Sequence, residues 1–119
     1  MPDKDFIIVA LDLLSGVTQG LGSNTAALMD IYGQNLLTLL SVCLKDPNSE
    51  VRQSAYALLG DLSISVFASL KPHINQIMPE VISQIEVNVD PMRISVCNNA
   101  IWASGEIAIK HGIKMYNWL

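Results

Sequence analysis

The sequence predicts an all-α protein built as a solenoid of antiparallel helix pairs, about two and a half repeats long. Proline residues recur at a nearly fixed interval, since Pro2, Pro47 and Pro91 are 45 and 44 residues apart. Glycine residues recur in the same way, because Gly60 and Gly105 are 45 residues apart and each precedes an acidic residue. A period near 44 residues lies in the range of about 40–47 residues that is typical of HEAT and armadillo units.

Long α-helices are predicted over residues 4–21, 48–69 and 91–111, because each segment places its apolar residues on one helical stripe. Pro47 and Pro91 fall near the starts of two of these helices, where a missing N–H group costs nothing. The expected core stripes are Ala10, Leu14, Val17 and Leu21, then Val51, Ala55, Leu58, Leu59, Leu62 and Val66, then Val96, Ala100, Ala103 and Ile107.

Shorter helices are expected between the long ones, over residues 34–45 and 72–87. Pro79 lies inside the second of these and is expected to kink it. Residues 114–119 are interpreted as the start of a further short helix, and residues 25–33 as a longer connection that contains a short helical piece. Neither end of this partial solenoid has a polar cap, so a piece of a longer protein is expected.

Composition excludes several classes of protein. Half of the 119 residues are hydrophobic and 15% are charged, which is too apolar for a disordered chain. The net charge of −4 disfavours nucleic acids and favours basic partners. No secretory signal is visible, and no run approaches the roughly 20 uncharged apolar residues of a membrane span, so we expect no membrane insertion.

Catalytic and metal-binding patterns are absent from the sequence. Cys43 and Cys97 form neither a disulfide framework nor a zinc quartet, and are interpreted as small buried residues in a reducing compartment. His73 and His111 are far apart and have no matching nucleophile. Without a metalloprotease, P-loop or nucleophile-elbow motif, we expect no enzyme activity, no cofactor and no metal site.

A possible binding surface follows from the helix faces opposite the core stripes. In the third long helix Ile94, Asn98, Trp102 and Glu106 are four residues apart and share one face. Such a face, acidic at its edges with an indole in the middle, suits an extended ligand that carries basic and aromatic side chains. The equivalent positions on the other two long helices are Gln53, Ala57 and Asp61, and Asp12, Ser15 and Gln19.

Each of these residues also has a purely structural interpretation. A lone Trp102 more often packs in a core, and a lone Asp61 more often faces solvent or caps a helix. Asn98 and Asn99 could simply bond the backbone of a neighbouring helix. The repetition of the same face on three helices favours the binding interpretation.

Three long segments resemble the transportin family of importin-β-type nuclear import receptors. They are residues 4–16, 50–62 and 95–107, which read KDFIIVALDLLSG, EVRQSAYALLGDL and SVCNNAIWASGEI. The resemblance implies a superhelix of about twenty HEAT repeats that carries cargo with basic proline-tyrosine nuclear localisation signals from cytoplasm to nucleus. It also implies Ran GTPase and nucleoporins as partners, with most of the Ran-binding surface outside this chain.

The resemblance also assigns roles within the chain. It implies that Asp61 receives a basic cargo side chain, whereas Gln19 departs from the family pattern, which has an acid there. Gln53 and Glu106 are further possible contacts. The alternative is a generic HEAT-repeat scaffold, or another importin-β-like adaptor, without this cargo site. The remaining residues that the resemblance places in contact with the cargo signal are Trp102, Asn98, Ile94, Asp12 and Ser15.

Overall fold

The computed structural model describes residues 4–84 and 94–111, and these residues are helical except at short turns such as the one at 44–48. No strand occurs in these two ranges. The helix expected at 114–119 lies outside the described residues. The elements, in chain order, are α1 (Lys4–Leu21), η1 (Gly22–Asn24), α2 (Thr25–Cys43), α3 (Ser49–Ser65), α4 (Phe67–Leu70), η2 (Lys71–His73), α5 (Ile74–Ser83) and α6 (Ile94–His111).

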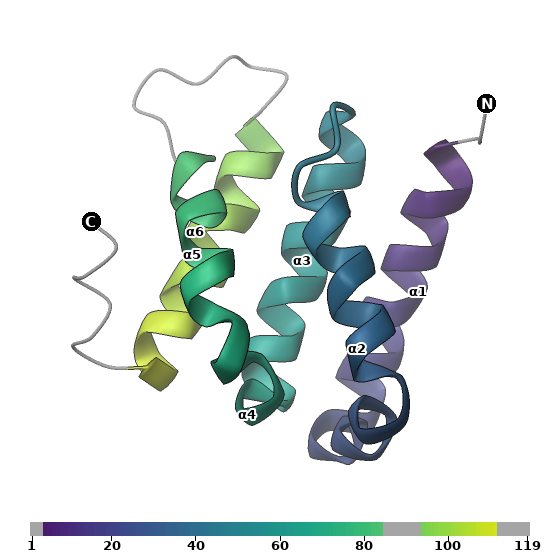
Figure 1. Ribbon diagram of the computed structural model, residues 1–119. Coiled ribbons are helices and arrows are strands. Elements are labelled where there is room, and N and C mark those ends of the chain that lie inside the picture. Colours follow the sequence, from purple (N-terminus) through teal and green to yellow (C-terminus); the bar gives the residue numbers. More distant parts are fainter. Residues whose placement is uncertain (1–3, 85–93, 112–119) are drawn as a thin grey trace.

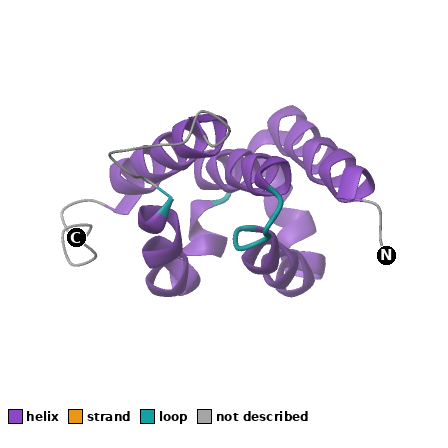
Figure 2. Cartoon of the chain, turned by 90° about the horizontal axis from the view of Figure 1, so that it is seen from above, coloured by secondary structure: helices purple, strands orange, loops and turns teal. Residues whose placement is uncertain are grey.

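The helices form two layers. Seen from above, α1, α3 and α6 lie in one layer, and α2 and α5 lie in the other (Figure 2). Along the chain, α1, α3 and α6 run in one direction while α2 and α5 run back (Figure 1). α3 lies in the middle of its layer and packs against both α1 and α6. Stacked antiparallel pairs of this kind confirm the predicted all-α, HEAT-type solenoid.

The core is centred on α3. Every residue of its predicted stripe is at most 5% exposed, and the predicted stripe of α6 is at most 2% exposed. Tyr56 of α3 is also fully buried, and its hydroxyl donates a hydrogen bond of 3.1 Å to the backbone oxygen of Glu80. That oxygen lies near the end of α5, where helical carbonyls lack N–H partners, so the bond ties α5 to α3.

The predicted stripe of α1 is confirmed in part, because Leu14 packs against the core, but its C-terminal half is wrong. Val17 and Leu21 are 38% and 40% exposed, whereas Leu11, Ser15 and Thr18 are buried. Thr18 can face the core because its hydroxyl donates a hydrogen bond of 2.8 Å to the Leu14 oxygen. Counting apolar residues alone therefore misplaced the buried face in the second half of this helix.

α2 is longer than the helix expected at 34–45. It begins at Thr25, so the stretch interpreted as a connection is continuous helix. Thr25, Met29 and Gly33 are four residues apart and all buried, which extends the core face of Leu40 by two turns. The sequence interpretation treated Gly33 as a boundary, but a small residue on a buried helix face can pack closely.

The helix expected at 48–69 is broken near its end. α3 stops at Ser65, and Val66 leaves the helical conformation with φ −141° and ψ 46°. The chain then turns through α4 and η2, so that Leu70 reaches the core with 0% exposure. The helix expected at 72–87 starts at Ile74 and contains Pro79; residues 85–87 and 91–93 lie outside the described residues.

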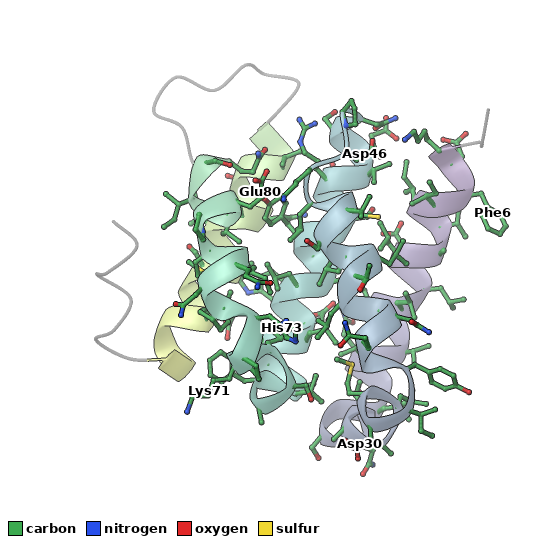
Figure 3. The ribbon with its side chains drawn as sticks, viewed as in Figure 1. Phe6, Asp30, Asp46, Lys71, His73 and Glu80 are labelled. Atoms are coloured by element: carbon green, nitrogen blue, oxygen red, sulfur yellow. The ribbon has the colours of Figure 1, made fainter. Side chains whose placement is uncertain are left out.

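The turn between α2 and α3 is held by a small polar network. The Asn48 side chain caps α3 by accepting from the backbone N–H groups of Glu50 and Val51, at 2.8 and 3.4 Å. Asp46, labelled at this turn in Figure 3, binds the Lys4 ammonium of α1 at 2.8 Å. The turn therefore fixes the start of α3 against the start of α1.

The outer face of α1 is apolar and open. Phe6 is 77% exposed and points away from the bundle (Figure 3), and Val9 and Leu13 are 64% and 66% exposed. Val17 and Tyr32 help to line an apolar hollow of about 300 Å³ between α1 and α2. A neighbouring helix pair normally covers such a face in a solenoid.

One stretch is apolar enough to pass a test for membrane spans. A window within Lys4–Cys43 has a mean hydropathy of 1.5, sufficient in length and composition alone to cross a membrane. The stretch contains Lys4, Asp5, Asp12 and Asp30, so it is not an uncharged run of the kind that the sequence analysis sought. The test is weak evidence for a span, because this stretch consists of two helices, α1 and α2, that turn back on each other at Gly22, where φ is +54°.

Candidate functional site

The predicted site residues all come from the layer formed by α1, α3 and α6, with α3 in the middle (Figure 1). We call this surface the α1–α3–α6 face and define it by the predicted site residues that these helices carry. Their exposure differs. Asn98, Trp102, Gln53, Asp12 and Gln19 are exposed, Glu106 is intermediate, and Ser15 and Asp61 are buried. Ile94 is the first residue of α6, and its side chain lies outside the described residues.

Trp102 lies against the backbone of α3. A β-carbon added at Gly60 would overlap the six-membered ring of the indole, so the ring occupies the space that any other residue at position 60 would fill. The indole nevertheless remains 38% exposed. One side of the ring is thus held by α3, and the remainder is open to a ligand.

A hydrogen bond also joins α6 to α3. The Asn99 amide donates a hydrogen bond of 2.9 Å to the backbone oxygen of Gln53. This geometry matches the structural interpretation of Asn99, in which the amide bonds the backbone of a neighbouring helix, whereas Asn98 stays exposed. Together with Trp102, Asn99 sets how α6 lies along α3.

Asp61 lies at the contact between α3 and α1. Its side-chain oxygen accepts a hydrogen bond of 3.1 Å from the Gln19 amide, and the residue is only 7% exposed. Burial raises the pKa of this carboxyl above its ordinary value, while the Gln19 amide and the Ser15 hydroxyl act in the opposite direction. Asp61 is therefore a covered carboxylate and not the open one that the sequence suggested.

The structure brings the predicted residues together in two groups on either side of α3. Ser15, Gln19 and Asp61 form one group, and Trp102 with Gly60 forms the other. Gly60 and Asp61 are consecutive, so α3 joins the groups. The described contacts tie neither Asp12 nor Glu106 to either group.

Gly60 was missed as a site residue. The sequence analysis used it only as a marker of the repeat, although a glycine one repeat away from Gly105 also signals a possible close approach between helices. At Gly105 a β-carbon would meet nothing within 4 Å, so the two glycines of the repeat serve different purposes.

Metal chemistry finds no support in the part of the chain that the structure describes. No group of three or more His, Cys, Asp or Glu side chains is close enough to hold an ion there. Cys43 is buried and free, and burial raises the pKa of its thiol, which disfavours the reactive thiolate.

Comparison with known proteins gives a consistent result. The chain is 51% identical over 118 residues, 99% of its length, to Transportin-1 from Mus musculus and from Homo sapiens. It is 38% identical over its whole length to importin subunit beta-2 from Schizosaccharomyces pombe. The chain spans 12% of the length of the first two relatives and 13% of the third. No family model matches it.

Proposed function

Because the chain belongs to the transportin family, we propose that it forms part of the cargo-binding wall of a nuclear import receptor. The ligand is an extended, basic nuclear localisation signal that ends in proline and tyrosine, bound without catalysis on the α1–α3–α6 face. In this role the whole receptor shuttles between cytoplasm and nucleus, with Ran GTPase and nucleoporins as its other partners.

The observation that supports the proposal is the partial exposure of the Trp102 indole. A packing residue is sealed between helices, whereas this indole rests on Gly60 and keeps 38% of its surface open. Aromatic side chains held on one side and open on the other are effective anchors for extended peptides, since little further ordering is needed. Asp61, which follows Gly60 on α3 and faces α1, supplies the negative charge that a basic signal requires.

Peptide binding tests the proposal. The 119-residue chain is titrated with a basic proline-tyrosine peptide by calorimetry, and circular dichroism verifies the fold of each variant. We expect Trp102→Ala to weaken binding about 30-fold, the loss typical of a buried aromatic anchor. Asp61→Asn removes the charge without changing the size of the side chain, and should weaken binding of the same peptide about tenfold.

The matched control is Tyr32→Ala, which removes a 59% exposed aromatic side chain from α2, away from the proposed face. Its affinity should equal that of the parent chain. Equal peptide affinity for Trp102→Ala and the parent would contradict the proposed site, and would leave the generic HEAT-repeat scaffold as the better description.

A further inference from the structure

The Gln19 side chain covers the one buried carboxylate among the described residues of the α1–α3–α6 face. Its amide nitrogen donates to the Asp61 carboxylate across the contact between α1 and α3, from a position 42 residues earlier in the chain. Gln19 is itself exposed, whereas Asp61 is 7% exposed. The amide is therefore the group that a ligand arriving from solvent meets before it reaches the carboxylate.

No positively charged side chain among the described residues binds the Asp61 carboxylate, which acts as a hydrogen-bond acceptor. The hydrogen bond to this carboxylate comes from the neutral Gln19 amide, and the neutral Ser15 hydroxyl lies close enough to lower its pKa. A carboxylate gains more from a guanidinium than from a neutral amide, because the guanidinium adds the attraction of opposite charges and can donate two N–H bonds at once. A basic ligand side chain can thus replace the amide with a net gain.

Gln19 also has room to move. Gly16, one helical turn earlier on α1, has no side chain, and a β-carbon there would meet nothing within 4 Å. The same open space surrounds Gly20. Neither of these positions on α1 carries a side chain that holds Gln19 in place, so the loss when Gln19 leaves Asp61 is one hydrogen bond from an amide to the carboxylate.

We propose that Gln19 is a displaceable stand-in for a ligand cation: its amide occupies the Asp61 carboxylate until an arginine or lysine side chain of the ligand replaces it. Gln19 then sets both the affinity and the charge selectivity of this subsite. The inference rests on the proposed function in taking the ligand to be a basic peptide segment.

Removal of the amide tests the inference. Gln19→Ala opens the carboxylate, and Gln19→Met removes the N–H donor while keeping a side chain of similar length. Both variants should bind an arginine-containing proline-tyrosine peptide about fivefold more tightly than the parent, the effect of abolishing one competing hydrogen bond. A peptide with citrulline in place of arginine should gain nothing, because it lacks the charge.

The controls separate this inference from the proposed function. Gln76→Ala removes an exposed glutamine from α5, outside the face, and should leave both affinities unchanged. Acetyl-arginine amide, which contains no proline-tyrosine pair, is titrated in parallel while NMR follows the Asp61 carboxyl carbon. This small probe should also bind the two Gln19 variants about fivefold more tightly, and Asp61→Asn should abolish the gain.

The outcomes are distinct. A proline-tyrosine peptide that binds no variant overturns the proposed function, and the small arginine probe still decides the role of Gln19. If both Gln19 variants bind the arginine probe within about twofold of the parent, or if the citrulline peptide gains as much as the arginine peptide, Gln19 serves only to join α1 to α3 and the inference fails.

Discussion

The two sides of α3 are held to their neighbours by different means. Toward α6, the Trp102 ring fills the space left by Gly60. Toward α1, polar side chains meet, with Gln19 on Asp61 and, at the turn that precedes α3, Lys4 on Asp46. The contact with α6 therefore depends mainly on shape, with one hydrogen bond from Asn99, whereas the contact with α1 adds polar pairs and an ion pair to its apolar packing.

This difference teaches how one helix can support two kinds of binding contact. A ring seated on a glycine has one position, so the aromatic part of the face is formed before a ligand arrives. The Gln19–Asp61 pair includes one exposed side chain, so Gln19 can give way to another partner and the acidic part of the face can rearrange. Substitutions in the α3–α6 contact and in the α3–α1 contact should therefore differ in the size and the sign of their effects on stability.

Gly60→Val should have the largest effect and destabilise the chain by about 2 kcal/mol, because the new side chain overlaps the indole and overpacking of this kind costs about 1–3 kcal/mol. Denaturant unfolding measures the loss. The matched control is Gly16→Val, at a helical glycine with open space around it, which should be neutral or slightly stabilising. Equal stability of the two variants would show that shape does not hold α6 to α3.

Asp46→Asn should cost about 1 kcal/mol at pH 7, because it removes the negative partner of Lys4 but keeps an oxygen for the Asn48 N–H group. The Lys4 hydrogen bond holds the pKa of Asp46 below its ordinary value of 3.8. Its stabilising effect is therefore complete above pH 3.8 and is lost as the pH falls through the lower pKa of the folded state.

Measurement of unfolding free energies between about pH 7 and pH 2 checks this prediction. The difference between parent and Asp46→Asn should shrink toward zero at the acid end. A difference that persists below the folded-state pKa would mean that Asp46 acts through its shape and not through its charge.

Asp61→Asn should have the smallest effect on stability and the opposite sign. Burial raises the pKa of Asp61 in the folded chain, so the charged form opposes folding at neutral pH. Asparagine keeps an oxygen for the Gln19 amide and should slightly stabilise the chain at pH 7. The advantage should fade as the pH falls through the raised pKa toward 3.8, because the parent carboxyl becomes protonated and regains stability.

Paired unfolding curves of the parent and Asp61→Asn at about pH 7 and pH 3 measure this change. A marked loss of stability at pH 7 would show that the charge of Asp61 is needed to hold α1 against α3.

Much of the fold could be predicted from spacing alone. The repeat of proline and glycine near 44 residues predicts stacked helix pairs, and the core faces of α3 and α6 follow from helical periodicity. The core face of α1 could not be obtained in this way, since Ser15 and Thr18 are buried and apolar residues remain exposed. Periodicity records where apolar residues fall, whereas neighbouring helices decide which face is covered.

The members of the candidate site remain predictions from the sequence, and their contacts could not be predicted from it. The spacing of Trp102 and Asp61 places them on suitable faces, yet it gives no sign that Gln19 bonds Asp61 or that Gly60 seats the indole. Both contacts join residues about one repeat apart, and they depend on the offset of each helix along the axis of its neighbour. A single sequence carries little information on that distance, because several offsets would bury similar apolar areas.

The most direct test of the account is the fluorescence of Trp102 during peptide binding. The chain contains two tryptophans, so Trp118→Phe leaves Trp102 as the single reporter. Titration with the basic proline-tyrosine peptide should produce a saturable blue shift of the emission, with the same midpoint as calorimetry, because the ligand covers the exposed part of the indole. Calorimetric binding with no change in the Trp102 emission would contradict the account, since the ligand would then occupy another surface.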